Sequence, residues 1–367
     1  MIRSFARRMR EDAVLLSSAV LAAASCAVSL EGFRSIDWEV IASLFNLMVT
    51  VELLEGFRLL EIAAQRMLRA LGSTRKAALA MGILTLLSST LFTNDVALLS
   101  LVPVSLTMSR IGSFDAREIV VVQTVAANLG SSLTPMGNPQ NLFVFSFFSL
   151  SPTDFFSTTA PLFLAGLLYV LLASAAVPSK RVHLPTEGLR LRASFGLSIT
   201  WLTFAAVVAS IFGLAPKPVA TSVVLLAAWT VRRGALLEVD YNLLLTFVCF
   251  FVFVGNVSSA EEVRKTLGSL LSDPRSTLLA SVALSQVISN VPAAVLLSPF
   301  AGSPKALLLG VNLGGLGTLV ASLANLISFK LYLRENPGGG RAFLKIFTVH
   351  NALLLLLLLP LFALLWR

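Results

Sequence analysis

Two short polar stretches interrupt apolar runs and carry groups that could bind ions. They are Thr93-Asn94-Asp95 and Ser289-Asn290-Val291-Pro292. A carboxylate deep in apolar surroundings is costly and is usually kept for function, and Asp95 could bind Na⁺ or accept a proton there. An asparagine offers a carbonyl oxygen to a cation and an amide to an anion. The two stretches predict ligands for a substrate and a coupling ion, with Asn94, Asp95 and Asn290 as the candidate Na⁺ ligands.

Structural roles are the alternative for both stretches. Asp95 could simply cap a helix predicted over 96–109 and accept its backbone N–H groups. The second stretch could be a polar turn packed against protein. Pro292 is suited to start a half-helix, whose N-terminus favours negative charge.

Two longer stretches, 126–141 and 312–325, lie in apolar sequence but cannot each form one continuous helix. Glycines interrupt both, and the first also contains two prolines, which remove backbone donors. Each contains Asn-Leu-Gly followed by a closing Asn, 13 positions after the first (141 − 128 and 325 − 312). Freed carbonyl oxygens can bind Na⁺, and half-helix N-termini can hold an anion.

The predicted binding residues of these two breaks are polar side chains and glycines. In the first break they are Asn128, Gly130, Ser131, Thr134, Gly137, Asn138 and Asn141, and in the second Asn312, Gly314, Gly315, Thr318, Ser322 and Asn325. The alternative is that the glycines serve helix packing while Ser and Thr satisfy backbone groups. Paired breaks in the two halves of a membrane protein favour a shared transport site.

The composition is that of a membrane protein. Of the 367 residues, 56% are hydrophobic and 13% charged, and the mean hydropathy is +0.86. The net charge of +9 comes from short basic clusters between apolar runs, which is typical of cytoplasmic loops rather than of a nucleic-acid surface. The sequence contains no phosphate-binding GxxxxGKS/T and no HExxH motif. We therefore expect no enzyme and no cofactor, except Na⁺ or H⁺ as a coupling ion.

The order of apolar runs predicts an all-α polytopic membrane protein made of two inverted repeats. Residues 1–177 form the first, with a re-entrant hairpin at 77–109 and a broken helix at 118–150. Residues 178–213 are a cytoplasmic loop and a linking helix. Residues 214–367 form the second, with a hairpin at 276–303 and a broken helix at 305–334.

Nine full spans are expected. Besides the two broken helices they are 13–30, 38–55, 158–177, 194–213, 217–231, 240–257 and 345–366, with an amphipathic surface helix at 56–73. Most Lys and Arg then face the cytoplasm, as does the N-terminus. We expect a multi-pass protein of the cell (inner) membrane, in contact with lipid.

These motifs resemble the ion transporter superfamily, which includes arsenite permeases, one class of Na⁺/H⁺ antiporters and citrate transporter-like permeases. Thr93-Asn94-Asp95-Val96 is similar to the hairpin tip of its arsenite and antiporter branch. Gly137-Asn138-Pro139-Gln140-Asn141 is similar to that branch's Gly-(Asn/Asp)-Pro-Pro-Asn, with Gln140 in place of the second Pro. Ser289-Asn290-Val291-Pro292 and Asn312-Leu313-Gly314-Gly315 match the second-half counterparts.

The resemblance implies a secondary transporter, commonly a homodimer, with a mobile domain that moves like an elevator. Its hairpin-tip ligands would be Asn94, Asp95, Ser289 and Asn290, and its breaks would be lined by Asn128, Gly130, Asn138, Asn312 and Gly314. We predict transport of a small, carboxylate-like anion coupled to H⁺ or Na⁺. Na⁺/H⁺ antiport and arsenite efflux are the alternatives.

Overall fold

The computed structural model describes residues 13–69, 72–181 and 194–364. These residues form helices and no β-strand; a single bridge pairs Ser73 with Arg181. The all-α prediction is therefore confirmed. The basic start of the chain and most of the predicted cytoplasmic loop lie outside the described residues.

The described part of the chain has nine helical elements in its first half and eleven in its second. The first half comprises α2 (Ala13–Ser25), η1 (Glu31–Ser35), α3 (Trp38–Glu55), α4 (Leu59–Arg69), α5 (Thr74–Ser88), α6 (Asn94–Gly112), α7 (Arg117–Ser131), α8 (Pro139–Phe147) and α9 (Pro152–Ala176). The second comprises α10 (Phe195–Ile211), α11 (Lys217–Val231), α12 (Ala235–Glu238), α13 (Tyr241–Ser258), α14 (Glu261–Leu270), α15 (Pro274–Ile288), α16 (Asn290–Leu297), η2 (Ser298–Phe300), α17 (Pro304–Gly314), α18 (Leu323–Glu335) and α19 (Gly340–Ala363).

Matching N-caps begin the equivalent helices α3 and α13. The Asp37 side chain accepts hydrogen bonds from the backbone N–H groups of Glu39 and Val40. The Asp240 side chain accepts from the N–H of Leu243. A side-chain acceptor at this position satisfies donors that have no partner within the helix, which explains why both spans start at an aspartate.

Four helices in the described part of the chain are long and apolar enough to cross a membrane: α6, α9, α13 and α19. The pair α3 and α4, bent by 49°, would be a fifth. The remaining expected spans are shorter apolar helices, such as α10 and α11, or pairs of half-helices. On length alone α6 could cross, although the sequence assigns it to a hairpin with α5.

Several predicted boundaries were wrong by a few residues. Helix α9 begins at Pro152 rather than at 158, and α19 begins at Gly340 rather than at 345. The half-helix α16 begins at Asn290, so Pro292 lies in its first turn and does not start it. Proline is tolerated in a first turn because the N–H it lacks has no intrahelical partner there.

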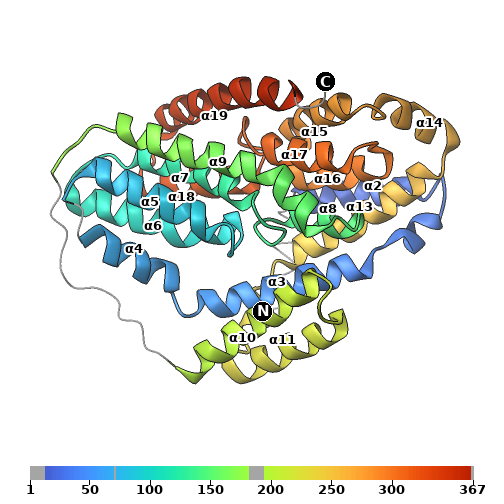
Figure 1. Ribbon diagram of the computed structural model, residues 1–367, viewed down its shortest axis with the longest axis horizontal. Helices are drawn as coiled ribbons and strands as arrows, with labels where there is room; N and C mark the ends of the chain where they lie inside the picture. The colour runs from blue at the N-terminus through green and yellow to red at the C-terminus, as the bar shows by residue number, and fades with distance from the viewer. Residues whose placement is uncertain (1–12, 70–71, 182–193, 365–367) are drawn as a thin grey trace.

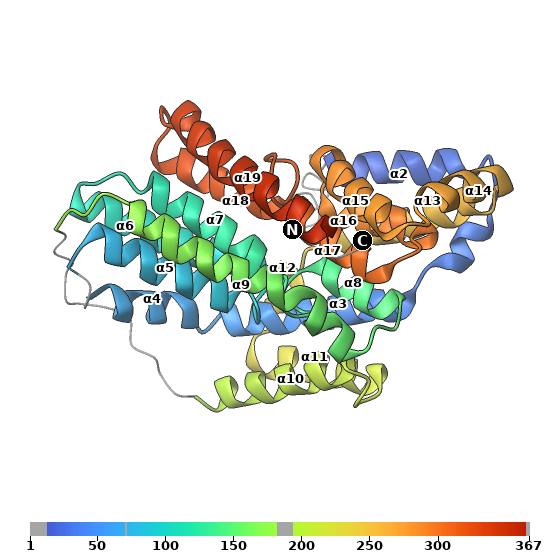
Figure 2. The same cartoon turned by 45° about the horizontal axis from the view of Figure 1, so that its top comes forward.

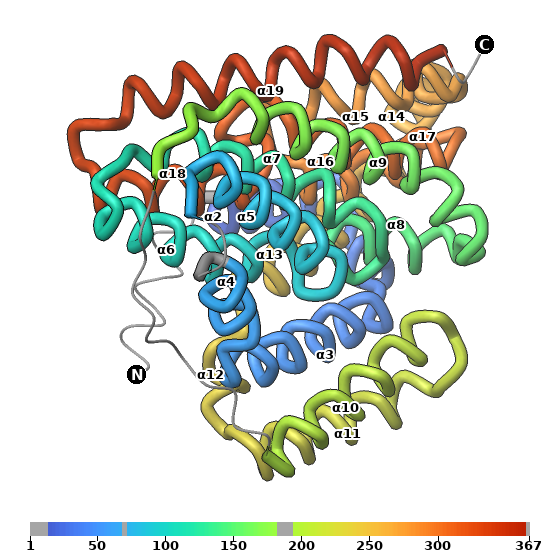
Figure 3. Tube along the Cα trace, turned by 60° about the vertical axis from the view of Figure 1, so that its left-hand side comes forward, coloured from blue at the N-terminus to red at the C-terminus, as the bar shows by residue number. Residues whose placement is uncertain are grey.

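The second part of each broken helix packs against the other half of the chain. Helix α8, from the first half, packs against α16 and α17 of the second, whereas α18 packs against α6 and α7 of the first. Figures 1 and 3 show these helices gathered in one body, with α10 and α11 beneath α3 as an outlying layer. Figure 2 shows the same layer at the lower edge of the molecule.

Candidate functional site

Four asparagines join the two broken helices at their centre. The Nδ2 of Asn128 donates to the Oδ1 of Asn325 at 2.8 Å, and the Nδ2 of Asn312 donates to the Oδ1 of Asn141 at 2.7 Å. Equivalent residues are 184 positions apart (312 − 128 and 325 − 141). Each half therefore donates one of these two hydrogen bonds and accepts the other, as in an isologous contact about a two-fold axis.

Two further bonds extend this reciprocal pattern. The Nδ2 of Asn138 donates to the Oδ1 of Asn312 at 3.2 Å, and the Oγ of its counterpart Ser322 donates to the Oδ1 of Asn128 at 3.0 Å. All four side chains are almost fully buried. Buried polar groups are costly unless paired, so this network fixes how the two breaks fit together.

Each break is also tied to the hairpin of its own half. The backbone N–H of Asn94 donates to the Gly137 carbonyl at 3.0 Å, and that of Asn290 donates to the Ala321 carbonyl at 3.0 Å. The hydroxyl of Thr134 donates to the Thr90 carbonyl, and that of Thr318 donates to the Gln286 carbonyl at 3.0 Å. Hairpin tips and breaks are therefore positioned as one unit.

The amides of Asn141 and Asn325 satisfy carbonyl groups freed by the breaks. The Nδ2 of Asn141 donates at 3.1 Å to the carbonyls of Ser131, Ser132 and Thr134. The Nδ2 of Asn325 donates at 3.0 Å to the carbonyls of Gly315 and Thr318. These contacts give both asparagines a structural part in the breaks.

Glycines allow the first arm of each hairpin to touch the broken helix. A Cβ at Gly130 would lie 2.2 Å from the Leu86 carbonyl oxygen and 2.4 Å from the Ser89 Oγ. A Cβ at Gly314 would lie 2.4 Å from the Ser285 Oγ. Such distances exclude any side chain unless the backbone moves, so both glycines serve close helix packing.

A pocket of about 150 Å³ lies where the hairpin tips and the breaks meet. The predicted site residues that line it are Asn94, Asp95, Ser289, Asn290 and Ser322. The pocket also has lining residues that the sequence did not mark as ligands, among them Gln140, Asp240, Thr246 and Val291. The other predicted residues of the breaks do not line this pocket: most are buried, whereas Thr318 is exposed and bonds to Gln286.

Sequence signals for some of the additional residues exist. Gln140 occupies the position at which the family that this sequence resembles has its second Pro. Asp240 corresponds to Asp37, and both aspartates cap a helix. Thr246 lies in the apolar run of α13, and no sequence pattern distinguishes it.

The structure contradicts the alternative that Asp95 caps its helix. Thr93 is the N-cap of α6, and its hydroxyl oxygen accepts the N–H of Val96 at 3.4 Å. Asp95 lies in the first turn, and its own N–H donates to the Asn94 Oδ1 at 3.0 Å. The Asp95 Oδ1 is buried and has no hydrogen-bond partner in the described part of the chain. A buried, unpaired carboxylate oxygen is suited to receive a ligand.

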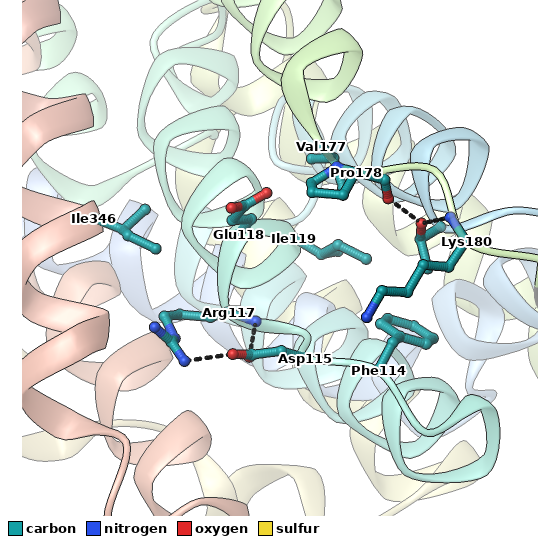
Figure 4. Close-up of a pocket in the computed structure, with 10 residues that line it drawn as sticks. Phe114, Asp115, Arg117, Glu118, Ile119, Val177, Pro178, Lys180 and Ile346 are labelled. Carbon is teal, nitrogen blue, oxygen red and sulfur yellow. Dashed lines mark hydrogen bonds and ion pairs between the residues drawn. The ribbon is translucent and has the colours of Figure 1, made fainter.

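A second pocket, of about 130 Å³, lies at the far end of α7, near the start of the predicted cytoplasmic loop. Figure 4 shows the Arg117 guanidinium bonded to the Asp115 carboxylate and the Lys180 backbone bonded to a neighbouring hydroxyl. Arg117 also donates to the hydroxyl of Tyr332 from the second half at 3.4 Å. This pocket contains none of the predicted site residues.

A sequence profile of the family described as "Citrate transporter" (CitMHS) matches residues 4–307. The chain belongs to this citrate transporter family. It is 35% identical over 307 residues to "Inner membrane protein YbiR" of Escherichia coli (strain K12), covering 81% of this chain and 80% of that protein. It is 31% identical over 309 residues to "Uncharacterized transporter MJ0456" of Methanocaldococcus jannaschii, covering 82% and 83%.

The fold of this citrate transporter family member is similar to a solved structure, the YdaH transporter of Alcanivorax borkumensis. The TM-score is 0.58 at 17% identity, covering 92% of this chain and 86% of that one. With the apolar helices, these similarities establish a multi-pass membrane transporter.

Proposed function

We propose that this protein is a secondary active transporter that moves a small, carboxylate-like anion across the cell membrane, coupled to H⁺ or Na⁺. The observation that carries the proposal is the convergence of four helix N-termini on one pocket. The first residues of α6, α8, α16 and α18 all line it. Each N-terminus carries a partial positive charge, which favours a bound anion.

The coupling ion is assigned to Asp95. Its carboxylate lies in the same pocket as the four N-termini, and its Oδ1 finds no partner among the described residues. A proton or Na⁺ bound there neutralises the carboxylate and reduces its repulsion of an anion in the same pocket. Binding of the cation and of the anion are thereby linked, and each raises the affinity for the other.

The transport cycle fits an elevator motion of the hairpins and broken helices against α3, α10 and α11. The hydrogen bonds between the breaks and tips make that body a single unit. We expect a homodimer in the inner membrane with a cytoplasmic N-terminus, as the resemblance implies. Na⁺/H⁺ antiport or arsenite efflux is the second candidate, favoured by the Asp95 carboxylate.

Proteoliposomes test the proposal directly. The purified protein would be given an imposed pH gradient or an imposed Na⁺ gradient, one at a time, with labelled citrate, succinate and arsenite outside and a pH dye inside. We expect one of the two gradients to drive accumulation of a carboxylate. Na⁺-driven proton movement, or arsenite transport, without carboxylate uptake would replace the proposal with its alternative.

A further inference from the structure

The two hairpin tips share one backbone fold but differ in chemistry. Residues of the first tip match those of the second 196 positions on, so Thr93, Asn94 and Asp95 correspond to Ser289, Asn290 and Val291. The equivalent bonds from the tips to the breaks, described above, support this alignment. The difference between the tips decides which ion each can hold.

The first tip uses its own side chains to satisfy its backbone donors. The N–H of Asn94 donates to Gly137, that of Asp95 to the Asn94 Oδ1, and that of Val96 to the Thr93 Oγ1. The Asn94 amide in turn contacts the Asn128 Oδ1 at 3.4 Å. What the first tip presents to the pocket is therefore the carboxylate of Asp95, a ligand for a cation.

The second tip has a backbone N–H and a side-chain amide that make no hydrogen bond within the described residues. The Ser289 side chain makes no capping bond, and Pro292 has no N–H at the position equivalent to Val96. The backbone N–H of Val291 finds no acceptor among the described residues. The side chain of Asn290 is 3% exposed, lines the pocket, and has no hydrogen-bond partner among those residues either. An amide that borders the pocket and has no protein partner is available to a ligand.

The half-helix starts that follow the breaks show the same asymmetry. In α8 the first residue, Pro139, has no N–H, and the Asn138 side chain caps the N–H of Asn141, which leaves one free donor, on Gln140. In α18 the N-cap Ser322 makes no side-chain capping bond, because its hydroxyl is used on Asn128. The N–H groups of Leu323 and Ala324 therefore find no acceptor in the described part of the chain.

We infer that the pocket is divided: the first repeat holds the coupling cation at Asp95, and the second repeat holds a carboxylate of the substrate. The anion ligands are the Asn290 amide and the free N–H groups of Val291 and Leu323, and all three residues line the pocket. A single carboxylate at the two tips implies one cation bound at the tips in each cycle. This inference rests on the proposed function and reassigns Asn290 from the cation to the anion.

A substitution at position 323 can remove one backbone N–H donor with little other change to the pocket. Leu323 is the first residue of α18, where proline is tolerated, and the preceding Ser322 has an extended backbone (φ −146°, ψ 141°) that suits a following proline. Its equivalent 184 positions earlier is Pro139. Leu323→Pro deletes one free N–H, and Leu323→Ala removes the side chain while keeping that N–H.

The test measures citrate and succinate uptake into proteoliposomes as a function of carboxylate concentration and, separately, of Na⁺ concentration and pH. We expect Leu323→Pro to raise the half-saturating carboxylate concentration about tenfold or more, because a hydrogen bond to a charged group is lost. Leu323→Ala keeps the N–H and should raise that concentration less than Leu323→Pro does. At saturating carboxylate, the dependence of uptake on Na⁺ and pH should be the same in both variants as in the wild type.

Val291→Asp provides a second, independent readout. A carboxylate at the second tip should abolish carboxylate uptake while leaving the protein folded, as judged by size-exclusion chromatography. Equal carboxylate affinity in Leu323→Pro and Leu323→Ala would overturn the division of the pocket, and unchanged uptake by Val291→Asp would do the same. A wild-type protein that transports no carboxylate would instead overturn the proposed function, and this inference with it.

Discussion

The Nδ2 of Asn128 donates to the Oδ1 of Asn325 at 2.8 Å, across 197 positions of the sequence. The bond joins the end of α7 to the start of α18, and the reciprocal bond from Asn312 to Asn141 joins α17 to α8. Each repeat supplies one asparagine before its break and one after it. The side-chain hydrogen bonds of each break are therefore formed only when the other repeat is in place. The pocket wall is therefore shared by both halves.

Removing one of these asparagines should destabilise the protein. Asn312→Ala leaves the Asn141 Oδ1 without its buried donor, and an unsatisfied buried group costs about 1–3 kcal/mol. The Asn138 Nδ2 loses one acceptor but keeps its bond to the Ser131 Oγ. Unfolding in mixed detergent–SDS micelles measures the change in free energy. The control Asn336→Ala removes only the bond from an exposed amide to the Tyr332 carbonyl at the end of α18, and should cost about 0.5 kcal/mol. Equal stabilities for the two variants would argue against the network.

Gly130→Ala should be poorly tolerated, because its Cβ would lie 2.2 Å from the Leu86 carbonyl oxygen. Overpacking of this kind typically costs about 1–3 kcal/mol. Gly268→Ala is the matched control, since nothing lies within 4 Å of a Cβ there and the position is within α14. That change should be neutral or stabilise the helix by up to about 1 kcal/mol. A stable Gly130→Ala protein would show that the hairpin can move away from α7.

The two hairpin tips should respond differently to loss of the hydroxyl. The hydroxyl of Thr93 caps α6, whereas that of Ser289 makes no capping bond. Thr93→Ala should lower the free energy of unfolding by about 1 kcal/mol. Ser289→Ala should have a smaller effect on stability. Equal losses in the two variants, measured by the same unfolding assay, would contradict the assigned caps.

A buried tyrosine links the corner between α6 and α7 to α18. The Tyr332 hydroxyl contacts Arg117 at 3.4 Å and Asp115 at 3.5 Å, and Tyr332→Phe removes both contacts. We expect a loss of about 0.5–1.5 kcal/mol. Arg110→Ala, which breaks an exposed ion pair with Glu335, should cost less than about 1 kcal/mol. A Tyr332→Phe protein as stable as wild type would show that these contacts add nothing.

The sequence predicted the repeated order of elements, because glycine, proline and polar clusters interrupt apolar runs at matching places. It also predicted that Asn94, Asp95 and Asn290 face one pocket. Helix ends were less predictable, because α9 begins with Pro152-Thr153-Asp154 and α19 with Gly340-Arg341, so each helix starts several residues before its apolar run. Segments that lie side by side only after folding, such as α8 against α16, carry no local signal.

The role of each asparagine in the breaks also required the folded structure. Asn128 and Asn141 look alike in the sequence, and both bond to the other repeat, yet only Asn141 also satisfies carbonyl groups of its own break. The sequence likewise could not show that Thr93, rather than Asp95, caps α6, because both residues are common at that position.

The central claim, that Asp95 couples anion transport to a cation, is tested most directly by Asp95→Asn in proteoliposomes. Two assays are compared: gradient-driven accumulation of a carboxylate, and exchange of internal for external carboxylate without a gradient. We expect the variant to retain exchange but to lose accumulation at least about tenfold, a change worth about 1.4 kcal/mol. Asp37→Asn, which keeps a capping side chain, should match the wild type in both assays. Wild-type dependence on pH and Na⁺ in Asp95→Asn would contradict the account.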